Sequence, residues 1–455
     1  MMIKNEKDNR AKLPANWAQM TREQKRKYRF DVFLNPEGID FVSPKAKQAY
    51  QVRAQRLVDV YNLKEPDRVP IMVPVGNLPY ILAGINMHTA MYDYDKAVQA
   101  CKKFNDRYSA ELEVFVGPMA TPGKVLELLD YKLYAWPGHG LSTDAPGYQF
   151  VEGEYMTADE YDALILDPSD FWLRTYLPRV FGAFESFRLA APLTDFIEMP
   201  TMQLMPLGLP QVQDTLQRML DAGKEFQKRA KITGEYARLG PASGFPMSMG
   251  SLCKAPFDII GDTLRGTQGI MKDMYRCPEK LLKAMDVIAD VTINAILNSA
   301  NISKMHIVSF PLHKGADGWM SQKQFETFYF PTLKKVMDAC IEDGLMVLLF
   351  AEGCFETRLE TVNVFPKGAT TWWFDQTDMF KAKRILGNKC SIQGNVPSSL
   401  LVASSPEVVK EYCHKLIEVC GKGGGFSLSA GCIPDNPKLE NVRAMLEAVK
   451  EYGVY

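Results

Sequence analysis

Residues 390–429 read CSIQGNVPSSLLVASSPEVVKEYCHKLIEVCGKGGGFSLS, with a short apolar run at each end, 390–393 and 425–429. Between the runs, Ser405-Pro406-Glu407 supplies an N-cap, a first-turn proline and a first-turn acid, which together indicate the start of a helix. Apolar side chains then recur at three- and four-residue intervals: Val409, Tyr412, Cys413, Leu416, Ile417 and Cys420. Closely spaced glycines follow and end that pattern. The stretch therefore predicts a strand, a helix and a second, parallel strand.

The same alternation extends over most of the chain. Eight apolar runs are candidate strands: 69–75, 112–116, 236–247, 306–311, 345–350, 370–374, 390–393 and 425–429. Eight strands alternating with helices favour a closed (β/α)₈ barrel of the α/β class. The alternative is an open, doubly wound sheet. Its Gly-x-Gly-x-x-Gly turn after the first strand is missing at 75–79, so we expect the barrel.

Two further segments belong to this organisation. Residues 1–60 are charged and periodic, which predicts an N-terminal helical extension with exposed helices at 22–27 and 43–58. The barrel then occupies 61–455. Within it, residues 118–235 form a long excursion between the second and third strands. We interpret this excursion as an inserted cap over the barrel mouth.

Composition excludes several function classes. Lysine and arginine total 53 against 54 acids, and no basic cluster is interleaved with aromatics, so we expect no nucleic-acid partner. The start, Met1 to Lys7, has no apolar core of a signal peptide, and no stretch approaches the ~20 apolar residues of a membrane span. The nine cysteines include no Cys-x-x-Cys pair. These features predict a cytoplasmic protein that does not enter a membrane.

Barrel enzymes carry their working residues just after the strands, at the carboxyl ends. His313, Glu352 and Cys432 follow the fourth, fifth and eighth runs, and these three donor types suit zinc with an open coordination position. Each has a structural alternative. His313 could be a hydrogen-bonded structural histidine, Glu352 could pair with Arg358, and Cys432 could be a small core residue.

Other polar residues stand at the same strand ends. Asp317 and Asp375 are candidates for acid–base catalysis, together with Glu352, although Asp375 could instead cap the following helix. Asn77, Met249 and Asn395 follow the first, third and seventh runs and are candidates for substrate binding. Met249 could equally be core filler, and Asn395 could form only a turn.

Four motifs carry a family resemblance. They are Asp67-Arg68-Val69-Pro70 at the first strand, Gly240-Pro241, the loop Gly394-Asn395-Val396-Pro397, and Gly431-Cys432-Ile433-Pro434 followed by Glu440-Asn441-Val442-Arg443-Ala444-Met445. With these motifs the chain resembles the uroporphyrinogen decarboxylase superfamily over roughly residues 60–455. The resemblance implies a (β/α)₈ barrel.

The superfamily has two large branches. The decarboxylases carry an arginine-rich segment near the first strand that grips porphyrinogen carboxylates, whereas residues 74–80 contain no arginine. The other branch comprises zinc-dependent, corrinoid-linked methyltransferases, with a His-x-Cys after strand five and a cysteine after strand eight. Cys432 matches the second element, Glu352 stands where the first cysteine would be, and His313 is the candidate for the missing histidine.

The resemblance therefore implies a zinc-dependent methyltransferase. We expect it to move a methyl group between a small O-methyl donor, such as an aryl methyl ether, and the cobalt of cobalamin. No Asp-x-His-x-x-Gly motif is present, so we expect the corrinoid to arrive on a partner protein. A homodimer is compatible with this prediction. The alternatives are a metal-independent decarboxylase acting on a carboxylate, and a non-catalytic barrel that binds a corrinoid or a partner.

Overall fold

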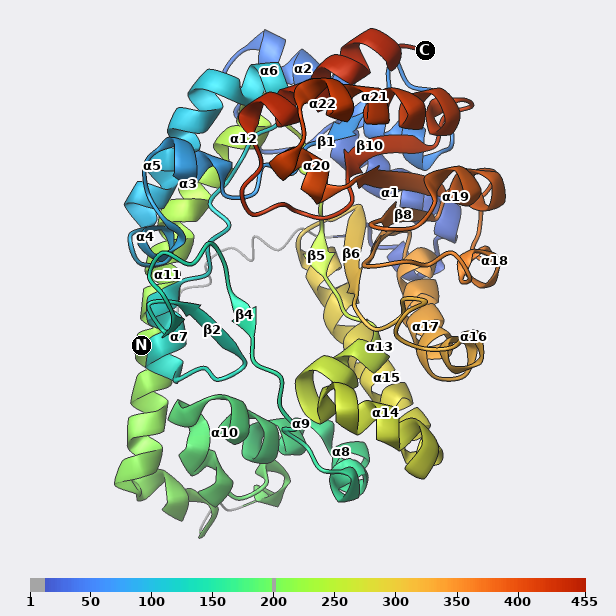
Figure 1. The fold of residues 1–455 in the computed structure, drawn as a ribbon. Coiled ribbons are helices and arrows are strands. Elements are labelled where there is room, and N and C mark those ends of the chain that lie inside the picture. Colours follow the sequence, from blue (N-terminus) through green and yellow to red (C-terminus); the bar gives the residue numbers. More distant parts are fainter. Residues whose placement is uncertain (1–12, 199–201) are drawn as a thin grey trace.

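A computed structural model describes residues 13–198 and 202–455. The expected absence of a signal peptide concerns Met1 to Lys7, which lie outside the described residues. Figure 1 shows a curled parallel sheet with helices on its outer side. The sheet has seven strands in the order β1-β10-β9-β8-β7-β6-β5. Their bounds are β1 Ile71–Met72, β5 Ser251–Leu252, β6 Ile307–Leu312, β7 Met346–Ala351, β8 Thr370–Phe374, β9 Ser391–Val396 and β10 Phe426–Ala430.

The helices alternate with these strands in the second half of the chain. In chain order they are α1 Arg22–Leu34, α2 Pro44–Tyr61, α3 Leu78–Leu82, α4 Met87–Tyr92, α5 Tyr94–Phe104, α6 Ala110–Leu112, α7 Gly123–Leu129, α8 Tyr161–Leu166, α9 Pro168–Phe171, α10 Leu177–Val180, α11 Pro210–Ala237, α12 Leu239–Ala242, α13 Pro256–Asp258, α14 Gly266–Arg276, α15 Pro278–Ile302, α16 Gln322–Gln324, α17 Phe330–Glu342, α18 Leu359–Val362, α19 Met379–Leu386, α20 Ser398–Ala403, α21 Pro406–Leu416 and α22 Leu439–Tyr452. None of the helices in the described part of the chain has the length and apolar character needed to cross a membrane.

The barrel-type α/β fold expected from the sequence is confirmed, with β1 and β5 as the two edges of the sheet. Six of the eight expected strands coincide with strands of the sheet. The two wrong strand predictions, 112–116 and 236–247, both fall between β1 and β5. The barrel is therefore curled but is not closed by hydrogen bonds between these two edges.

Local contacts explain why 112–116 is not a strand. Glu113 takes a left-handed conformation, with φ of 56°, and its carboxylate pairs with Arg68. The backbone N–H and C=O of Val116 bond to the side chain of Asn105, at 2.9 and 2.7 Å. Because the Asn105 amide already satisfies these two backbone groups, they do not join a strand ladder.

The first half of the segment 236–247 is mostly helical. Its beginning lies in α11, which runs to Ala237, and Gly240-Pro241 lies in the short helix α12. Proline lacks the N–H that a central strand would donate, so a Gly-Pro pair is better accommodated here than in a parallel ladder. The strand that joins β6 in its place is β5, which comes a few residues later.

The N-terminal helices are not exposed as expected. Side chains of α1 and α2 form one apolar cluster with side chains of β6, β7 and β8: Phe30, Phe33, Tyr50, Ala54, Leu57, Val58, Tyr61, Ile307, Met346, Leu348 and Trp373. Strand side chains alternate between the two faces of a sheet, and the intervening ones pack against the outer helices. The cluster with α1 and α2 therefore occupies the inner face, which we call the lumen. The N-terminal helices fill the lumen at the amino ends of the strands.

The segment 118–235 forms its own small layer beside the sheet (Figure 1). It contains a three-stranded sheet of β2 Tyr134–Pro137, β3 Gly140–Leu141 and β4 Gln149–Phe150, together with α7 to α10 and most of α11. Buried polar contacts join it to α14, since Tyr161 donates to Asp273 at 2.8 Å and Asp273 also accepts from Arg265. Its role as a cap over a substrate stays a prediction.

Candidate active site

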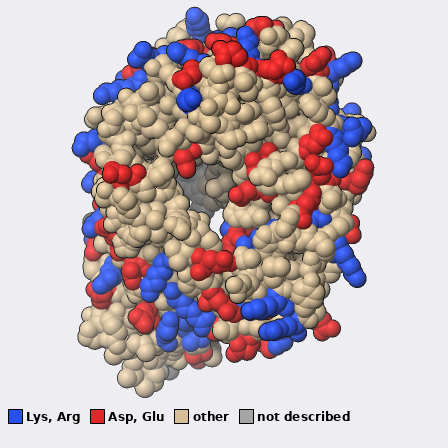
Figure 2. Space-filling view, viewed as in Figure 1, with Lys and Arg blue, Asp and Glu red and all other residues tan. Residues whose placement is uncertain are grey.

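Three of the predicted site residues share the lumen face. His313 continues the inward-facing series of β6, Glu352 continues that of β7, and Asp375 follows Trp373 of β8 on the same face. All three stand just past the carboxyl ends of their strands, where barrel enzymes build their sites. Figure 2 shows a hollow at the centre of this side of the molecule, beside β5 and β6, with acidic side chains on its rim.

His313 is held between two carboxylates. Its Nδ1 lies 2.6 Å from Oδ2 of Asp262, and its Nε2 lies 3.9 Å from Oε2 of Glu352. The Asp262 side chain is 12% exposed and that of Glu352 is 54% exposed. Asp262 therefore fixes the imidazole from the protein side, and Nε2 faces the open side of the site.

Two lysines surround Asp262. Lys254 Nζ lies 2.7 Å from Oδ2 and Lys314 Nζ lies 2.9 Å from Oδ1. Burial on its own would raise the pKa of Asp262. The hydrogen bond from His313 and the charges of the two lysines outweigh burial and hold that pKa well below its usual range. Asp262 is thus a fixed negative charge behind the imidazole.

The hydrogen bond with Asp262 raises the pKa of His313 above its ordinary value, against the opposing effect of burial. A raised pKa keeps the imidazole protonated at a higher pH than a free histidine. His313 is therefore suited to donate a proton from Nε2 toward the lumen.

A second aspartate fixes the backbone at this point. The fully buried Asp258 accepts from the backbone N–H groups of His313 and Lys314, both at 3.0 Å, and from Tyr329 Oη at 2.7 Å. Burial, followed by the charge of Asp262, raises the pKa of Asp258. These bonds lock the turn that aims His313.

Neither Asp258 nor Asp262 was selected from the sequence. Both lie between β5 and α14, where Asp258 ends α13 and Asp262 lies in the π-helical turn Ile259–Arg265. The third strand was predicted at 236–247 instead of at β5. The residues that follow β5 were therefore not considered as residues at a strand end. Their four-residue spacing, which brings two aspartates close together along a helix, was the available signal.

Zinc requires three or four ligand atoms that converge at about 2.0–2.3 Å. His313 and Glu352 are neighbours, but Cys432 Sγ contacts Ser398 Oγ at 3.4 Å. No group of three or more His, Cys, Asp or Glu side chains in residues 13–198 and 202–455 could hold a metal ion. The donors present therefore do not fit a three-ligand zinc site, and zinc binding by His313, Glu352 and Cys432 stays a prediction.

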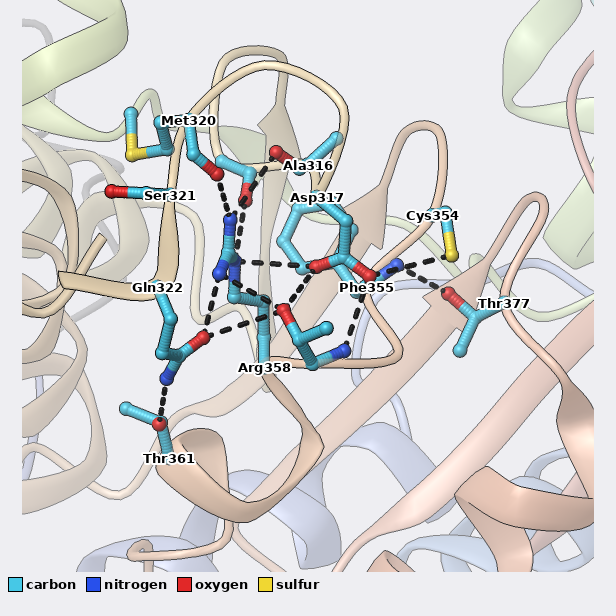
Figure 3. Close-up of polar contacts among 12 residues, drawn as sticks. Ala316, Asp317, Met320, Ser321, Gln322, Cys354, Phe355, Arg358, Thr361 and Thr377 are labelled. Atoms are coloured by element: carbon cyan, nitrogen blue, oxygen red, sulfur yellow. Dashed lines mark hydrogen bonds and ion pairs between the residues drawn. The ribbon is translucent and has the colours of Figure 1, made fainter. Parts of the chain in front are cut away.

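Asp317 lies in a network that joins two loops of the rim (Figure 3). Its carboxylate accepts from Thr357 Oγ1 at 2.7 Å and lies 3.4 Å from Arg358 Nε. Arg358 is 1% exposed, and it also bonds to Gln322 and to the carbonyl of Met320. These contacts tie Asp317 to both loops, and its role as a catalytic acid or base stays a prediction. Arg358 pairs with Asp317 instead of Glu352.

Asp375 and Asn395 have different surroundings. Asp375 Oδ2 accepts from the backbone N–H of Gly353 at 3.1 Å, and no ion pair in the described part of the chain involves it. Asn395 donates to the carbonyls of Asp375 and Thr377 at 3.1 and 2.8 Å, and it lines a cavity of about 340 Å³ beside Tyr412. Asn395 is thus occupied in holding the β8–α19 turn, whereas Asp375 is available to a ligand.

The other two predicted substrate-binding residues lie away from His313 in the fold. Asn77 donates to the carbonyl of Pro146 at 2.7 Å and lines a cavity of about 590 Å³ between α3, α4 and the 144–146 loop. Met249 is 44% exposed, just before the edge strand β5. The structure therefore groups His313, Glu352 and Asp375, and leaves Asn77, Met249 and Asn395 outside that group.

These observations define the class of protein, which is an α/β barrel with a group of polar residues at the carboxyl ends of its strands. Residues 215–452, more than half of the chain, match the family model described as "Uroporphyrinogen decarboxylase (URO-D)", and the chain belongs to this family of enzymes.

Individual relatives are distant. The uroporphyrinogen decarboxylase of Actinobacillus pleuropneumoniae serotype 5b (strain L20) is 25% identical over 288 residues, which cover 60% of this chain and 73% of the relative. That of Vibrio campbellii (strain ATCC BAA-1116) is 26% identical over 254 residues, or 54% of this chain and 67% of the relative. A solved methyltransferase from Methanosarcina mazei superposes with a TM-score of 0.55 at 15% identity, over 88% of this chain and 98% of that one. At this identity the superposition shows a shared fold.

Proposed function

We propose that this protein is a methyltransferase that moves a methyl group between an O-methyl donor and the cobalt of a separate corrinoid protein. The observation that carries the proposal is the position of His313 between Asp262 and Glu352. With Nδ1 bonded to Asp262, the Nε2 proton donor of His313 faces the lumen. Breaking the bond between a methyl carbon and an ether oxygen leaves charge on that oxygen. A positioned acid stabilises this charge as it forms.

The corrinoid is a co-substrate in this proposal and supplies the nucleophile that takes the methyl group. As the carbon–oxygen bond breaks, its electron pair stays on oxygen, and His313 gives its Nε2 proton to that oxygen, so the product is a free hydroxyl group. Asp262 stabilises the imidazolium before transfer, and Glu352 can return a proton to Nε2 from solvent. No step of this proposal passes through zinc, because the described donors do not converge on one ligand position.

The cations at the rim also bear on the substrate. Lys254 and Lys314 both pair with Asp262, and Arg358 pairs with Asp317. A substrate rich in carboxylates needs cationic partners that are not already neutralised. This pairing favours a donor without carboxylates and argues against a porphyrinogen.

A decarboxylase-like lyase is the second candidate, and it is favoured by the named relatives, which are uroporphyrinogen decarboxylases. In that reaction the carbon–carbon bond to the carboxylate breaks, carbon dioxide leaves, and a protonated group such as His313 gives the proton that replaces it. Both candidates use His313 as an acid, so the substrate distinguishes them. We place either activity in the cytoplasm.

The test uses purified protein, free cob(I)alamin kept reduced, and 4-methoxyphenol as the methyl donor. We expect the absorption spectrum of the corrinoid to change with time and 4-hydroxyphenol to accumulate in equal amount. His313→Gln should slow both by about 100-fold, the usual size of a lost general acid. The matched control is His414→Gln, since His414 stacks on Tyr452 between α21 and α22 and has no contact with the site.

The proposal would be wrong if neither 4-methoxyphenol nor other methoxylated aromatics changed the corrinoid spectrum, or if His313→Gln matched His414→Gln. Release of carbon dioxide from a carboxylate substrate, lost in His313→Gln, would establish the lyase instead.

A further inference from the structure

Three neighbouring strands present side chains to the lumen at one level. Phe350 of β7 pairs in register with Trp373 of β8, and Trp373 pairs with Gln393 of β9. Phe350 and Trp373 both pack in the cluster that α1 and α2 form inside the sheet, so their direction is inward. This level lies one step below Glu352 and Asp375, because residues two apart on a strand share a face.

The two aromatic rings form a floor. Their centroids lie 4.5 Å apart, with the planes inclined by 41°. The indole N–H of Trp373 donates to the carbonyl of Ala430 at 2.7 Å, so its polar atom is already satisfied. Phe350 is half-buried and Trp373 is buried, so the ring surface that this floor offers a ligand belongs mainly to Phe350.

Gln393 is the polar member of the same level. Its side chain is 6% exposed, and no other described residue donates to its amide or accepts from it. Its amide atoms keep a small accessible surface and are not among the enclosed polar atoms that lack a partner. The amide is therefore free to form a hydrogen bond with water or with a ligand beside Trp373.

Two carboxylates stand above the floor. Asp375 lies directly against Gly431, since a Cβ placed on Gly431 would lie 2.8 Å from Oδ1 and 2.9 Å from the backbone oxygen of Asp375. No Lys or Arg of residues 13–198 or 202–455 forms an ion pair with either carboxylate, and within these residues Glu352 has His313 as its ion-pair partner, at 3.9 Å. We call Phe350, Glu352, Trp373, Asp375 and Gln393 the lumen recess.

We propose that the lumen recess binds the ammonium group of an aromatic methyl donor, so that the substrate is a methoxylated aryl amine. This inference rests on the proposed function and names its class of substrate. An ammonium group is attracted by aromatic ring faces and by carboxylates, and the recess offers both together with an amide oxygen. The aryl ring of the donor packs on the floor, and Glu352 links the recess to His313, which acts on the ether oxygen.

The test compares three ligands that share one methoxyphenyl ring and differ in charge: 4-methoxyphenethylamine, 4-ethylanisole and 3-(4-methoxyphenyl)propanoate. Binding is measured by calorimetry on the full chain without any corrinoid, so it does not depend on methyl transfer. We expect the amine to bind about tenfold more tightly than the neutral ligand, the factor that a partly desolvated cation site provides. The carboxylate should bind more weakly than both.

Two variants assign this preference to the recess. Asp375→Asn and Glu352→Gln should each reduce the advantage of the amine over 4-ethylanisole about fivefold, while the affinity for 4-ethylanisole itself stays nearly constant. The matched control is Glu356→Gln, because Glu356 lies close by in the sequence but pairs with Lys381. This control should keep the full preference for the amine.

Equal binding of the amine and the neutral ligand by the wild type, or tighter binding of the carboxylate, overturns the inference. A preference that survives in both Asp375→Asn and Glu352→Gln also overturns it. Failure of the proposed function looks different, because the amine would then bind preferentially and yet give no methyl transfer. Methyl transfer from 4-methoxyphenol without any preference for binding the amine would support the proposed function. It would contradict the proposed role of the lumen recess.

Discussion

The behaviour of His313 is decided by its neighbours. Asp262 takes the Nδ1 side at 2.6 Å, and Lys254 and Lys314 hold Asp262 in its charged form. The open side of the imidazole is left for a reacting group. A histidine with one nitrogen fixed by a carboxylate has a defined tautomer and a raised pKa, and both are needed in an acid that works near neutral pH.

Asp262→Asn should shift the pH dependence of methyl transfer. The folded-state pKa of His313 is raised, so the protonated imidazole persists as the pH rises until that pKa is passed. Without the Asp262 charge the pKa of His313 falls back, and the alkaline limb of the rate profile moves to lower pH. The measurement is the rate against pH for both proteins. Asp286→Asn, on the exposed face of α15, is the control, and an unmoved limb in Asp262→Asn would contradict the prediction.

His306 should make stability depend on pH. Burial, with a smaller contribution from Arg29, lowers the pKa of His306 to about 3, and the imidazole stacks on Phe33 at 3.8 Å. As the pH falls below ~6.5, His306 binds a proton in the unfolded chain but stays neutral in the folded chain. The free energy of unfolding therefore falls by about 2 kcal/mol by pH 5.

His306→Phe keeps the stack and removes the titration. The free energy of unfolding in urea, compared at pH 7.5 and pH 5, should therefore fall less in His306→Phe than in the wild type. Equal losses in the two proteins would show that His306 does not control this pH dependence.

Among the elements, the loops after β6 and β7 act together. Figure 3 shows Asp317 and Arg358 joining them, with Gln322 at the start of α16 as a third member. The loop after β6 also carries His313 and Lys314. Holding these two loops at a fixed distance therefore keeps His313 and Glu352 on the same side of the lumen.

Asp317→Asn should affect stability more than chemistry. The change leaves the buried Arg358 without its carboxylate and should cost about 2 kcal/mol of unfolding free energy. At a temperature where the variant stays folded, the pH profile of methyl transfer should keep its wild-type shape. If the variant were as stable as the wild type but inactive, Asp317 would be a catalytic acid or base, as first predicted from the sequence. Asp338→Asn, at an exposed pair on α17, serves as the control.

At the scale of the whole molecule, the sheet is curled and the N-terminal helices fill one end of its lumen. Arg29 anchors α1 from inside this region, since its guanidinium pairs with Asp343 and donates to the carbonyl of Met305 at 2.7 Å. With that end filled, a ligand reaches the lumen from the carboxyl ends of the strands. This is the end that holds His313, Glu352 and Asp375.

Metal content tests the zinc prediction on the intact protein. Because Cys432 bonds to Ser398 and no three donors converge in the described residues, we expect chelator-treated protein to retain methyl transfer. Elemental mass spectrometry of wild type and Glu352→Ala gives the measurement. Stoichiometric zinc in the wild type, lost in Glu352→Ala together with activity, would restore the zinc site and replace the acid mechanism.

The sequence by itself determined the class of fold and which polar residues stand at the carboxyl ends of its strands. Apolar runs such as 345–350 and 370–374 are strands because their periodicity is local, and a carboxylate directly after such a run, as in Glu352, must lie at the rim. Motifs around Gly394 and Cys432 placed the chain in the family that the comparison shows.

Only the tertiary structure decided which polar residues meet. Asp262 and His313 are far apart in the chain, and their contact depends on how the turn after β5 packs beside β6. Asp317 and Asn395 look like site residues in the sequence, yet packing gives both of them partners within the loops. Side-chain partners across a barrel are set by strand register and loop packing, which a periodic pattern does not encode.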